Sequence, residues 1–161
     1  MSAIVELRVI GQGDDTFVED AWALKERIRG EEGVLRQRRG FFTDAYTRSQ
    51  SFALIEQSLD EERLVGFASV RRDGYILFLA VAPGERGEGH GKRLVAAVAE
   101  EYGTVTCHAR TSNENALDFY RSIGFDIVRK IDNYYEDYGD AYYLRLGEDS
   151  FTEKLSRFFG R

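Results

Sequence analysis

Residues 75–102 constrain the fold most, because an apolar run passes into a glycine-rich turn and then into an amphipathic helix. Residues 75–81 are apolar or aromatic throughout, which is typical of a strand in a central position. Glycines 84, 87, 89 and 91 follow, and Leu94, Val95, Val98 and Tyr102 repeat at helical spacing. Glycines let successive backbone N–H groups converge on one anion at a helix N-terminus. The segment therefore predicts a cradle for a ligand that carries a diphosphate.

The spacing within this turn disfavours two kinds of nucleotide loop. A Walker loop requires Ser or Thr after Gly-Lys, whereas Arg93 follows Lys92 here. The dinucleotide fingerprint requires G-x-G-x-x-G, whereas glycines 87, 89 and 91 are spaced by two. What remains is Arg86-x-x-Gly89-x-Gly91 after a strand, which resembles the acyl-CoA loop of the GCN5-related N-acetyltransferase (GNAT) family. On this motif alone, a plain turn between strand and helix stays an alternative.

A second block, residues 108–125, resembles the next acyl-CoA block of the same family. There a strand ends in Asn, and a helix carries Ala-x-x-x-Tyr before Gly-Phe, as Ala116 and Tyr120 do here. The two blocks stand in the family's order, separated by one helix and one strand. The resemblance implies an α/β fold with a mixed, mostly antiparallel central sheet flanked by helices. The sheet is expected to be splayed between the strands that end at Val81 and Arg110, within a single domain over 1–161.

Within the family, the likeness is greatest to the ribosomal-protein alanine and other N-terminal protein acetyltransferases. It is carried by His108-x-Arg-x-Ser-Asn113 and by Asn133-Tyr-Tyr135 followed by Asp140-Ala-Tyr142. This resemblance makes Tyr134 and Tyr135 candidates for peptide binding. The alternative is a solvated aromatic loop, although exposed aromatic side chains are unfavourable without a partner.

The resemblance also implies acetyl-CoA as co-substrate and assigns residues to it. The cofactor-binding candidates are Leu79, Ala80, Val81, Arg86, Gly87, Glu88, Gly89, His90, Gly91, Lys92 and Asn113. Arg86 and Lys92 are expected to contact phosphates, against the alternative of solvated charges. Tyr120 becomes the proton donor for the departing thiolate, since a phenol with a pKa of about 10 is protonated at neutral pH. A core tyrosine on the helix is the alternative.

Residues 104–110 are predicted to be a strand, and its alternation decides which side chains act together. Thr106, His108 and Arg110 share one side, and Cys107 and Ala109 the other, so Cys107 and His108 form no nucleophilic pair. His108 is a candidate base acting through water, or else a hydrogen-bonded strand histidine. Tyr75 matches the place of an assisting tyrosine in certain eukaryotic relatives.

The acceptor is predicted to be a primary amine, with a protein or peptide N-terminal α-amine favoured. An α-amine has a pKa of about 8, whereas a lysine near 10.4 requires about 3 kcal/mol more to deprotonate. Residues 31–50 lack the proline-containing segment with which relatives grip a peptide. Two alternatives therefore remain: an acetyltransferase for a polyamine or aminoglycoside-like amine, using Glu136, Asp137 and Asp140, and a non-catalytic acyl-CoA-binding module.

Composition excludes several other classes of function. The 161 residues carry 22 Lys and Arg against 28 Asp and Glu, and a net charge of −6 disfavours nucleic acid and anionic membranes. One cysteine excludes an internal disulfide, and with two histidines it is a poor case for a metal. The N-terminus lacks a signal-peptide pattern, so a cytoplasmic protein is expected. Residues 147–161 are predicted to form an amphipathic helix that mediates a homodimer or caps the sheet.

The remaining elements follow from periodicity and turn residues. Arg36, Arg38 and Arg39 are expected on a solvated face of a short helix within residues 31–50. A first helix should begin near residues 14–16 and end at Gly30, and residues 72–74 should form a tight hairpin turn. A later helix is expected from Ser112 or Asn113 to Gly124. Strands are predicted over 4–9, 51–56, 64–71, 75–81, 104–110, 125–131 and 141–146.

Overall fold

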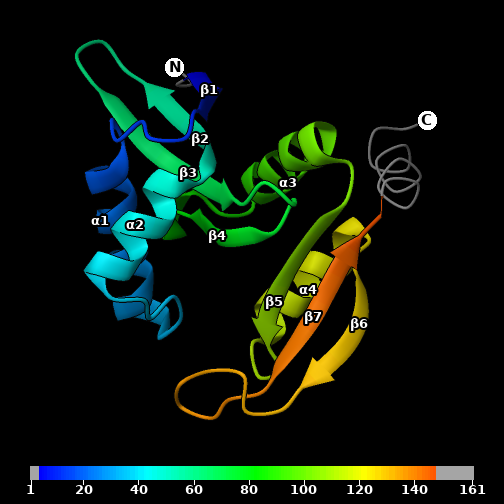
Figure 1. Ribbon diagram of the computed structural model, residues 1–161. Coiled ribbons are helices and arrows are strands. Elements are labelled where there is room, and N and C mark those ends of the chain that lie inside the picture. Colours follow the sequence, from blue (N-terminus) through cyan, green and yellow to red (C-terminus); the bar gives the residue numbers. More distant parts are fainter. Residues whose placement is uncertain (1–3, 148–161) are drawn as a thin grey trace. The chain divides into compact units, whose positions relative to one another are not determined.

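A computed structural model describes residues 4–147 (Figure 1). The elements run in the order β1 (Ile4–Ile10), α1 (Val18–Glu32), α2 (Arg39–Arg48), β2 (Gln50–Gln57), β3 (Glu62–Val70), β4 (Ile76–Val81), the 3-10 turn η1 (Pro83–Glu85), α3 (His90–Tyr102), β5 (Val105–Arg110), α4 (Glu114–Ile123), β6 (Asp126–Ile131) and β7 (Ala141–Leu146). The chain forms two compact units, and the boundary between them falls within α3, after Val98.

The first unit contains a four-stranded antiparallel sheet in the order β1-β2-β3-β4. Residues 72–74 form the predicted tight turn, with Gly74 at a φ of +81° and its N–H donating to the Arg71 carbonyl. The apolar run expected at a central position is the last strand of this sheet. Ile76, Phe78 and Ala80 on β4 are buried, and the residues between them are half-buried, which accounts for the unbroken apolar pattern.

Helices α1 and α2 supply the core that covers one face of this sheet (Figure 1). Phe42 of α2 lies at its centre, with its ring 4.7 Å from that of Phe78 and 5.6 Å from that of Trp22. Burying one such side chain contributes about 1.5–3 kcal/mol. Buried apolar residues of α1, including Ala21 and Ile28, complete the cluster. The buried residues of α1 thus form an apolar stripe that faces this core.

The end of α1 differs from the prediction. The helix continues past Gly30 to Glu32, and Gly33 follows at a φ of +72° with its N–H donating to the Arg29 carbonyl. Only Gly33 takes up the left-handed backbone that ends a helix in this way, and Gly30 is an ordinary helical residue. The sequence has a glycine at position 30 and another at position 33, and the helix ends at the second of them.

Lys25 belongs to the apolar stripe of α1 and is fully buried. Its ammonium group donates to the main-chain carbonyl of Gln37, forms an ion pair with Glu26 and lies 4.7 Å from the ring centre of Trp22. A buried cation is tolerated only when it is paired and hydrogen-bonded, as this one is. Lys25 thereby fastens the segment that follows α1 to the helix.

The second unit contains a three-stranded antiparallel sheet in the order β5-β7-β6. Val105, Cys107 and Ala109 of β5 are buried, and the residues between them are half-buried, so the predicted alternation is confirmed. Helix α4 directs Leu117, Tyr120 and Ile123 into the core of this unit. The contact of α4 with the buried side of β5 includes a hydrogen bond between Tyr120 and Cys107.

The predicted order of strands and helices is confirmed, as is the mixed α/β class with antiparallel sheets flanked by helices. The single domain and the splay after Val81 and Arg110 stay predictions. The helix expected over 147–161 lies outside the described residues from 148 on. Within residues 4–147, no helix is both long enough and apolar enough to cross a membrane.

Candidate functional site

The glycine-rich turn between β4 and α3 has the backbone geometry of an anion cradle. Gly87 and Gly89 have φ values of +85° and +80°, which L-residues rarely adopt. Helix α3 begins at His90, and the Arg93 N–H donates to the Gly89 carbonyl at 3.0 Å. The N–H groups of the first turn of a helix have no partner within it and attract anions. The backbone around 87–91 therefore suits a diphosphate.

Charged side chains on both sides of this cradle are tied to the first unit. Glu85 forms an ion pair with Arg63 of β3 at 2.6 Å. Arg86 forms an ion pair with Glu32 at the end of α1 at 2.7 Å, and its Nε donates to the Val81 carbonyl at 3.2 Å. Arg93 donates to the Val5 carbonyl at 2.9 Å. The loop is thus held by its side chains, and Arg86 is engaged within the protein.

The other predicted cofactor residues lie in the first unit or at the start of α4. Leu79 and Val81 are half-buried on one side of β4 and Ala80 is buried on the other. The side chains of Glu88 and Lys92 are exposed, and His90 Nε2 lies 4.0 Å from Glu88 Oε2. Asn113 caps α4, with its Oδ1 accepting the Ala116 N–H at 3.1 Å.

Gly66 of β3 is a residue of this region that the sequence interpretation did not single out. A Cβ at this position would lie 2.8 Å from the Ala80 carbonyl oxygen, which is too close for any side chain. A glycine inside a strand is itself a signal of close backbone approach. Gly66 therefore sets how closely β3 approaches the end of β4.

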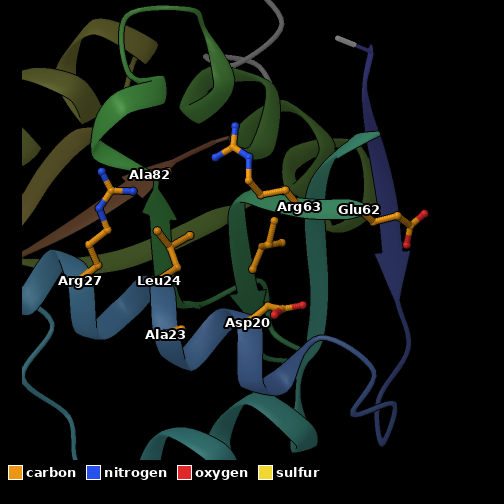
Figure 2. A pocket seen from close by; sticks show the side chains of 8 residues that line it. Asp20, Ala23, Leu24, Arg27, Glu62, Arg63 and Ala82 are labelled. Atoms are coloured by element: carbon orange, nitrogen blue, oxygen red, sulfur yellow. The ribbon is translucent and has the colours of Figure 1, made fainter. Parts of the chain in front are cut away.

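A cavity of about 280 Å³ lies between α1 and the start of β3 in the first unit (Figure 2). Its lining residues are Asp20, Ala23, Leu24, Arg27, Glu62, Arg63, Leu64 and Ala82. Most of the charged ones form ion pairs: Arg27 with Glu31, Glu62 with Arg8, and Arg63 with Glu56 and Glu85. These charges are therefore largely paired with one another, and none of the residues predicted to act in catalysis or to bind the cofactor lines the cavity.

Three predicted residues meet on the half-buried side of β5. The His108 ring stacks on that of Tyr134, with centroids 4.3 Å apart and planes at 14°. Tyr134 Oη lies 3.4 Å from His108 Nδ1, and Tyr135 contacts Tyr134 edge to face at 5.0 Å. Tyr143, opposite His108 on β7, adds a third ring 5.0 Å from the imidazole. The candidate base therefore lies under the candidate peptide-binding residues.

We call residues 132–140, between β6 and β7, the aromatic loop. Its Tyr135 ring lies 4.0 Å below the guanidinium carbon of Arg110, and Arg110 Nη1 donates to Asp137 Oδ1 at 3.0 Å. Burial raises the pKa of Tyr135 to about 12, so its phenol stays protonated at neutral pH. Arg110 was not predicted as a site residue, although strand alternation places it on the side of His108.

Tyr120 and His108 belong to opposite sides of β5. Tyr120 is 8% exposed and hydrogen-bonds to Cys107, whose side chain points away from that of His108. Burial raises the pKa of the Cys107 thiol to about 12, so the thiol stays protonated at neutral pH and does not act as a nucleophile. Within this unit the predicted proton donor and the predicted base therefore lie on opposite sides of β5, which is an edge strand of its sheet.

Tyr75 lies directly before β4, at the hairpin turn of the first unit. It is half-buried, and the Arg71 guanidinium carbon lies 4.4 Å from the centre of its ring. Its predicted assisting role stays a prediction, because Tyr75 and His108 belong to different units. Among residues 4–147 no group of three or more metal-ligating side chains is arranged to hold an ion.

Comparison with known proteins decides the family. A model of the acetyltransferase (GNAT) family matches residues 15–125. The chain belongs to the GNAT family. This confirms the resemblance that the two acyl-CoA blocks indicate, and it extends the match into the first helix, where the sequence offered only element order.

Similar GNAT proteins include several N-terminal acetyltransferases. The N-alpha-acetyltransferase RimI of Mycobacterium tuberculosis is 36% identical over 92 residues, which cover 51% of this chain and 58% of the relative. N-alpha-acetyltransferase 30 of Saccharomyces cerevisiae is 33% identical over 100 residues, which cover 58% of this chain and 57% of the relative. The match thus spans less than two thirds of these relatives.

A solved structure with the same fold is the ribosomal-protein alanine N-acetyltransferase from Escherichia coli. The TM-score is 0.69 at 21% identity, with 89% of this chain and 93% of that chain covered. At this level of identity the likeness shows the fold.

Proposed function

We propose that this protein transfers the acetyl group of acetyl-CoA to the α-amine of a protein or peptide N-terminus. The observation that carries the proposal is the stacking of Tyr134 on His108, with Tyr135 beside it. This arrangement joins a group able to accept a proton to aromatic surfaces able to hold a short peptide. Membership of the GNAT family and the likeness to N-alpha-acetyltransferases support it.

The donor side of the proposal rests on the cradle. Backbone N–H groups at Gly87, Gly89 and the start of α3 would hold the diphosphate of CoA, because positive-φ glycines and a helix N-terminus favour an anion. Leu79 and Val81 of β4 and Asn113 of α4 are proposed to contact the pantetheine arm. Of the predicted cradle residues, Lys92 and the backbone of His90 stay phosphate candidates, whereas Arg86 is engaged with Glu32.

The chemistry needs a base that takes the proton of the amine and an acid that gives a proton to the departing thiolate. The neutral amine attacks the thioester carbonyl, a C–N bond forms, the C–S bond breaks, and the thiolate leaves. The ammonium proton passes through water to His108, or to Tyr75, and Tyr120 supplies a proton to the thiolate. An α-amine with a pKa of about 8 is partly neutral at physiological pH, so a modest base is sufficient.

The alternative of a polyamine acceptor is not favoured by the geometry. It would use the carboxylates of Glu136, Asp137 and Asp140 to bind a cationic amine. Asp137 is already paired with Arg110, while Asp140 lies 3.5 Å from Lys130 Nζ and accepts the Asn133 N–H at 2.9 Å. Two of the three carboxylates therefore already have partners within the protein, and a polycation would have to compete for them with Arg110 and Lys130.

The test is an acceptor panel with acetyl-CoA, in which release of the CoA thiol is measured. The panel holds a lysine-free peptide with a free N-terminus, the same peptide blocked at its N-terminus and given one lysine, and a polyamine. We expect transfer to the first peptide only, with the acetyl group located on the α-amine by tandem mass spectrometry. Preferred transfer to lysine or polyamine contradicts the proposal, and CoA binding by calorimetry without thiol release identifies a binding module.

A further inference from the structure

We propose that Arg110 is a positioning residue for the acceptor, holding the aromatic loop so that Tyr134 stays stacked on His108. This inference rests on the proposed function, since it takes Tyr134 and Tyr135 as the residues that bind the peptide. It adds a residue whose role lies in the geometry of the loop.

Arg110 and His108 begin and end a closed series of contacts. The two residues lie on the same side of β5, two positions apart, which corresponds to about 6.6 Å along a strand. Arg110 stacks on Tyr135 at 4.0 Å, Tyr135 contacts Tyr134 at 5.0 Å, and Tyr134 stacks on His108 at 4.3 Å. Because both ends are fixed to one strand, a change at Arg110 is transmitted to the ring above His108.

The backbone of the aromatic loop needs such support. Asn133 and Tyr138 have φ values of +54° and +66°, a region that residues other than glycine adopt at a cost in strain. Asp137 Oδ1 accepts both the Arg110 guanidinium, at 3.0 Å, and the Gly139 N–H, at 3.1 Å. The same carboxylate oxygen thus ties Arg110 to the turn of the loop.

Gly139 gives independent support. Its backbone lies outside the left-handed region, so its φ does not demand a glycine. A Cβ on Gly139 would overlap the Arg110 guanidinium and lie 3.1 Å from Asp137 Oδ1. The absence of a side chain at 139 is therefore explained by the Arg110–Asp137 pair, and substitution at Gly139 displaces that pair.

The first experiment is steady-state kinetics of Arg110→Met and Arg110→Lys with acetyl-CoA and the α-amine peptide. Loss of the stacked, hydrogen-bonded guanidinium should raise the KM for the peptide about tenfold in Arg110→Met. The KM of Arg110→Lys for the peptide should lie between those of the wild type and Arg110→Met, because lysine keeps the charge but lacks the planar guanidinium group. The kcat and the KM for acetyl-CoA should stay unchanged. The matched control is Arg129→Met, which removes a guanidinium that lies over the Tyr143 ring, its carbon 4.8 Å from the ring centre, and its peptide KM should not change.

A double-mutant cycle tests the role of Gly139. Gly139→Ala should raise the KM for the peptide when Arg110 is present and have no further effect in the Arg110→Ala background, where the space is vacant. If Gly139→Ala raises the KM for the peptide by the same factor in both backgrounds, this explanation of Gly139 is wrong. Because Gly139→Ala and Arg110→Lys are small changes, they decide the matter if Arg110→Met fails to fold.

A second readout does not depend on activity. The chain has two histidines, so the ring protons of His108 and His90 are resolved by NMR with His90 as internal control. Arg110→Met should move the His108 ring signals toward those seen in Tyr134→Leu and leave those of His90 in place. Unchanged His108 signals and an unchanged peptide KM overturn the positioning role. If the wild-type protein does not acetylate the peptide, the proposed function fails, and the NMR comparison still decides the geometry.

Discussion

The cradle and the aromatic loop offer a ligand different kinds of group. The cradle offers backbone N–H groups, and the aromatic loop offers side chains. In the cradle, Glu85, Arg86 and Arg93 are tied to the first unit and the backbone N–H groups are left for binding. In the aromatic loop, backbone groups are tied by Asp137 and Asp140, and the rings of Tyr134 and Tyr135 remain for binding. A diphosphate is recognised by fixed dipoles, whereas a peptide end requires shaped side-chain surfaces.

The positive-φ residues of the two regions show the same contrast. The cradle places them on Gly87 and Gly89, which adopt this backbone freely. The aromatic loop places them on Asn133 and Tyr138, where hydrogen bonds to Asp140 and Tyr135 hold the strain. In the cradle, the most harmful substitutions should therefore be those that change the backbone conformation. In the aromatic loop, they should be those that remove a ring.

The largest effect is expected at Tyr120, which belongs to neither region. Tyr120→Phe removes the proposed proton donor, so kcat should fall about a hundredfold, while the KM for both substrates changes little. Tyr102→Phe on α3 is the matched control. A kcat within a few-fold of wild type in Tyr120→Phe would mean that this buried tyrosine serves only the core.

The next effect tests the backbone side of the comparison. Alanine at position 89 is strained at a φ of +80° by about 1–2 kcal/mol, and relief of that strain turns the N–H groups away. Gly89→Ala should weaken CoA binding about tenfold by calorimetry, without affecting the KM for the peptide. Gly84→Ala is the control, since that glycine has no positive φ and no heavy atom within 4 Å of an added Cβ. Equal CoA affinities of the two variants would show that the backbone conformation at Gly89 does not contribute to CoA binding.

A smaller effect tests the side-chain side. Tyr134→Leu removes a stacked ring, and aromatic pairs are worth about 0.5–1.5 kcal/mol, so the KM for the peptide should rise about two- to tenfold. CoA affinity should be unaffected. Tyr138→Leu, in the same loop but 77% exposed, should behave as wild type. If both tyrosines have the same effect, the stacking on His108 is not what matters.

The smallest effect is expected at Arg86. Because its guanidinium is paired with Glu32 and bonded to the Val81 carbonyl, Arg86→Gln should change CoA affinity by less than about threefold. Glu32→Gln should likewise change CoA affinity by less than about threefold. A tenfold loss in Arg86→Gln together with a weaker salt dependence of CoA binding would instead make Arg86 the phosphate ligand that the sequence predicts.

Features decided by neighbouring residues could be predicted from the sequence. The turn at 72–74, the alternation along β5 and the glycine cradle all follow from local preferences, and motif order was enough to predict the family. The resemblance assigned His108 and Tyr134 separate roles, but the contact between these two residues, which are 26 positions apart, could not be predicted from periodicity and was found only in the structure.

Features decided by distant partners could not be predicted. The extension of α1 to Gly33, the burial of Lys25 against the Gln37 carbonyl and the pairing of Arg86 with Glu32 depend on which segments meet in three dimensions. Arg110 was missed for the same reason, since it lies on β5 and its partners Tyr135 and Asp137 lie in the aromatic loop. The cytoplasmic location, the homodimer and the role of residues 147–161 stay predictions of the sequence.

The reaction we propose for this GNAT protein is acetylation of the α-amine of a peptide held by the aromatic loop. The most direct measurement uses one peptide that carries a free α-amine and one lysine, incubated with acetyl-CoA and the wild-type protein. Tandem mass spectrometry at early times locates the acetyl group. We expect acetylation of the α-amine, whereas preferred acetylation of the lysine would rule out the proposed acceptor.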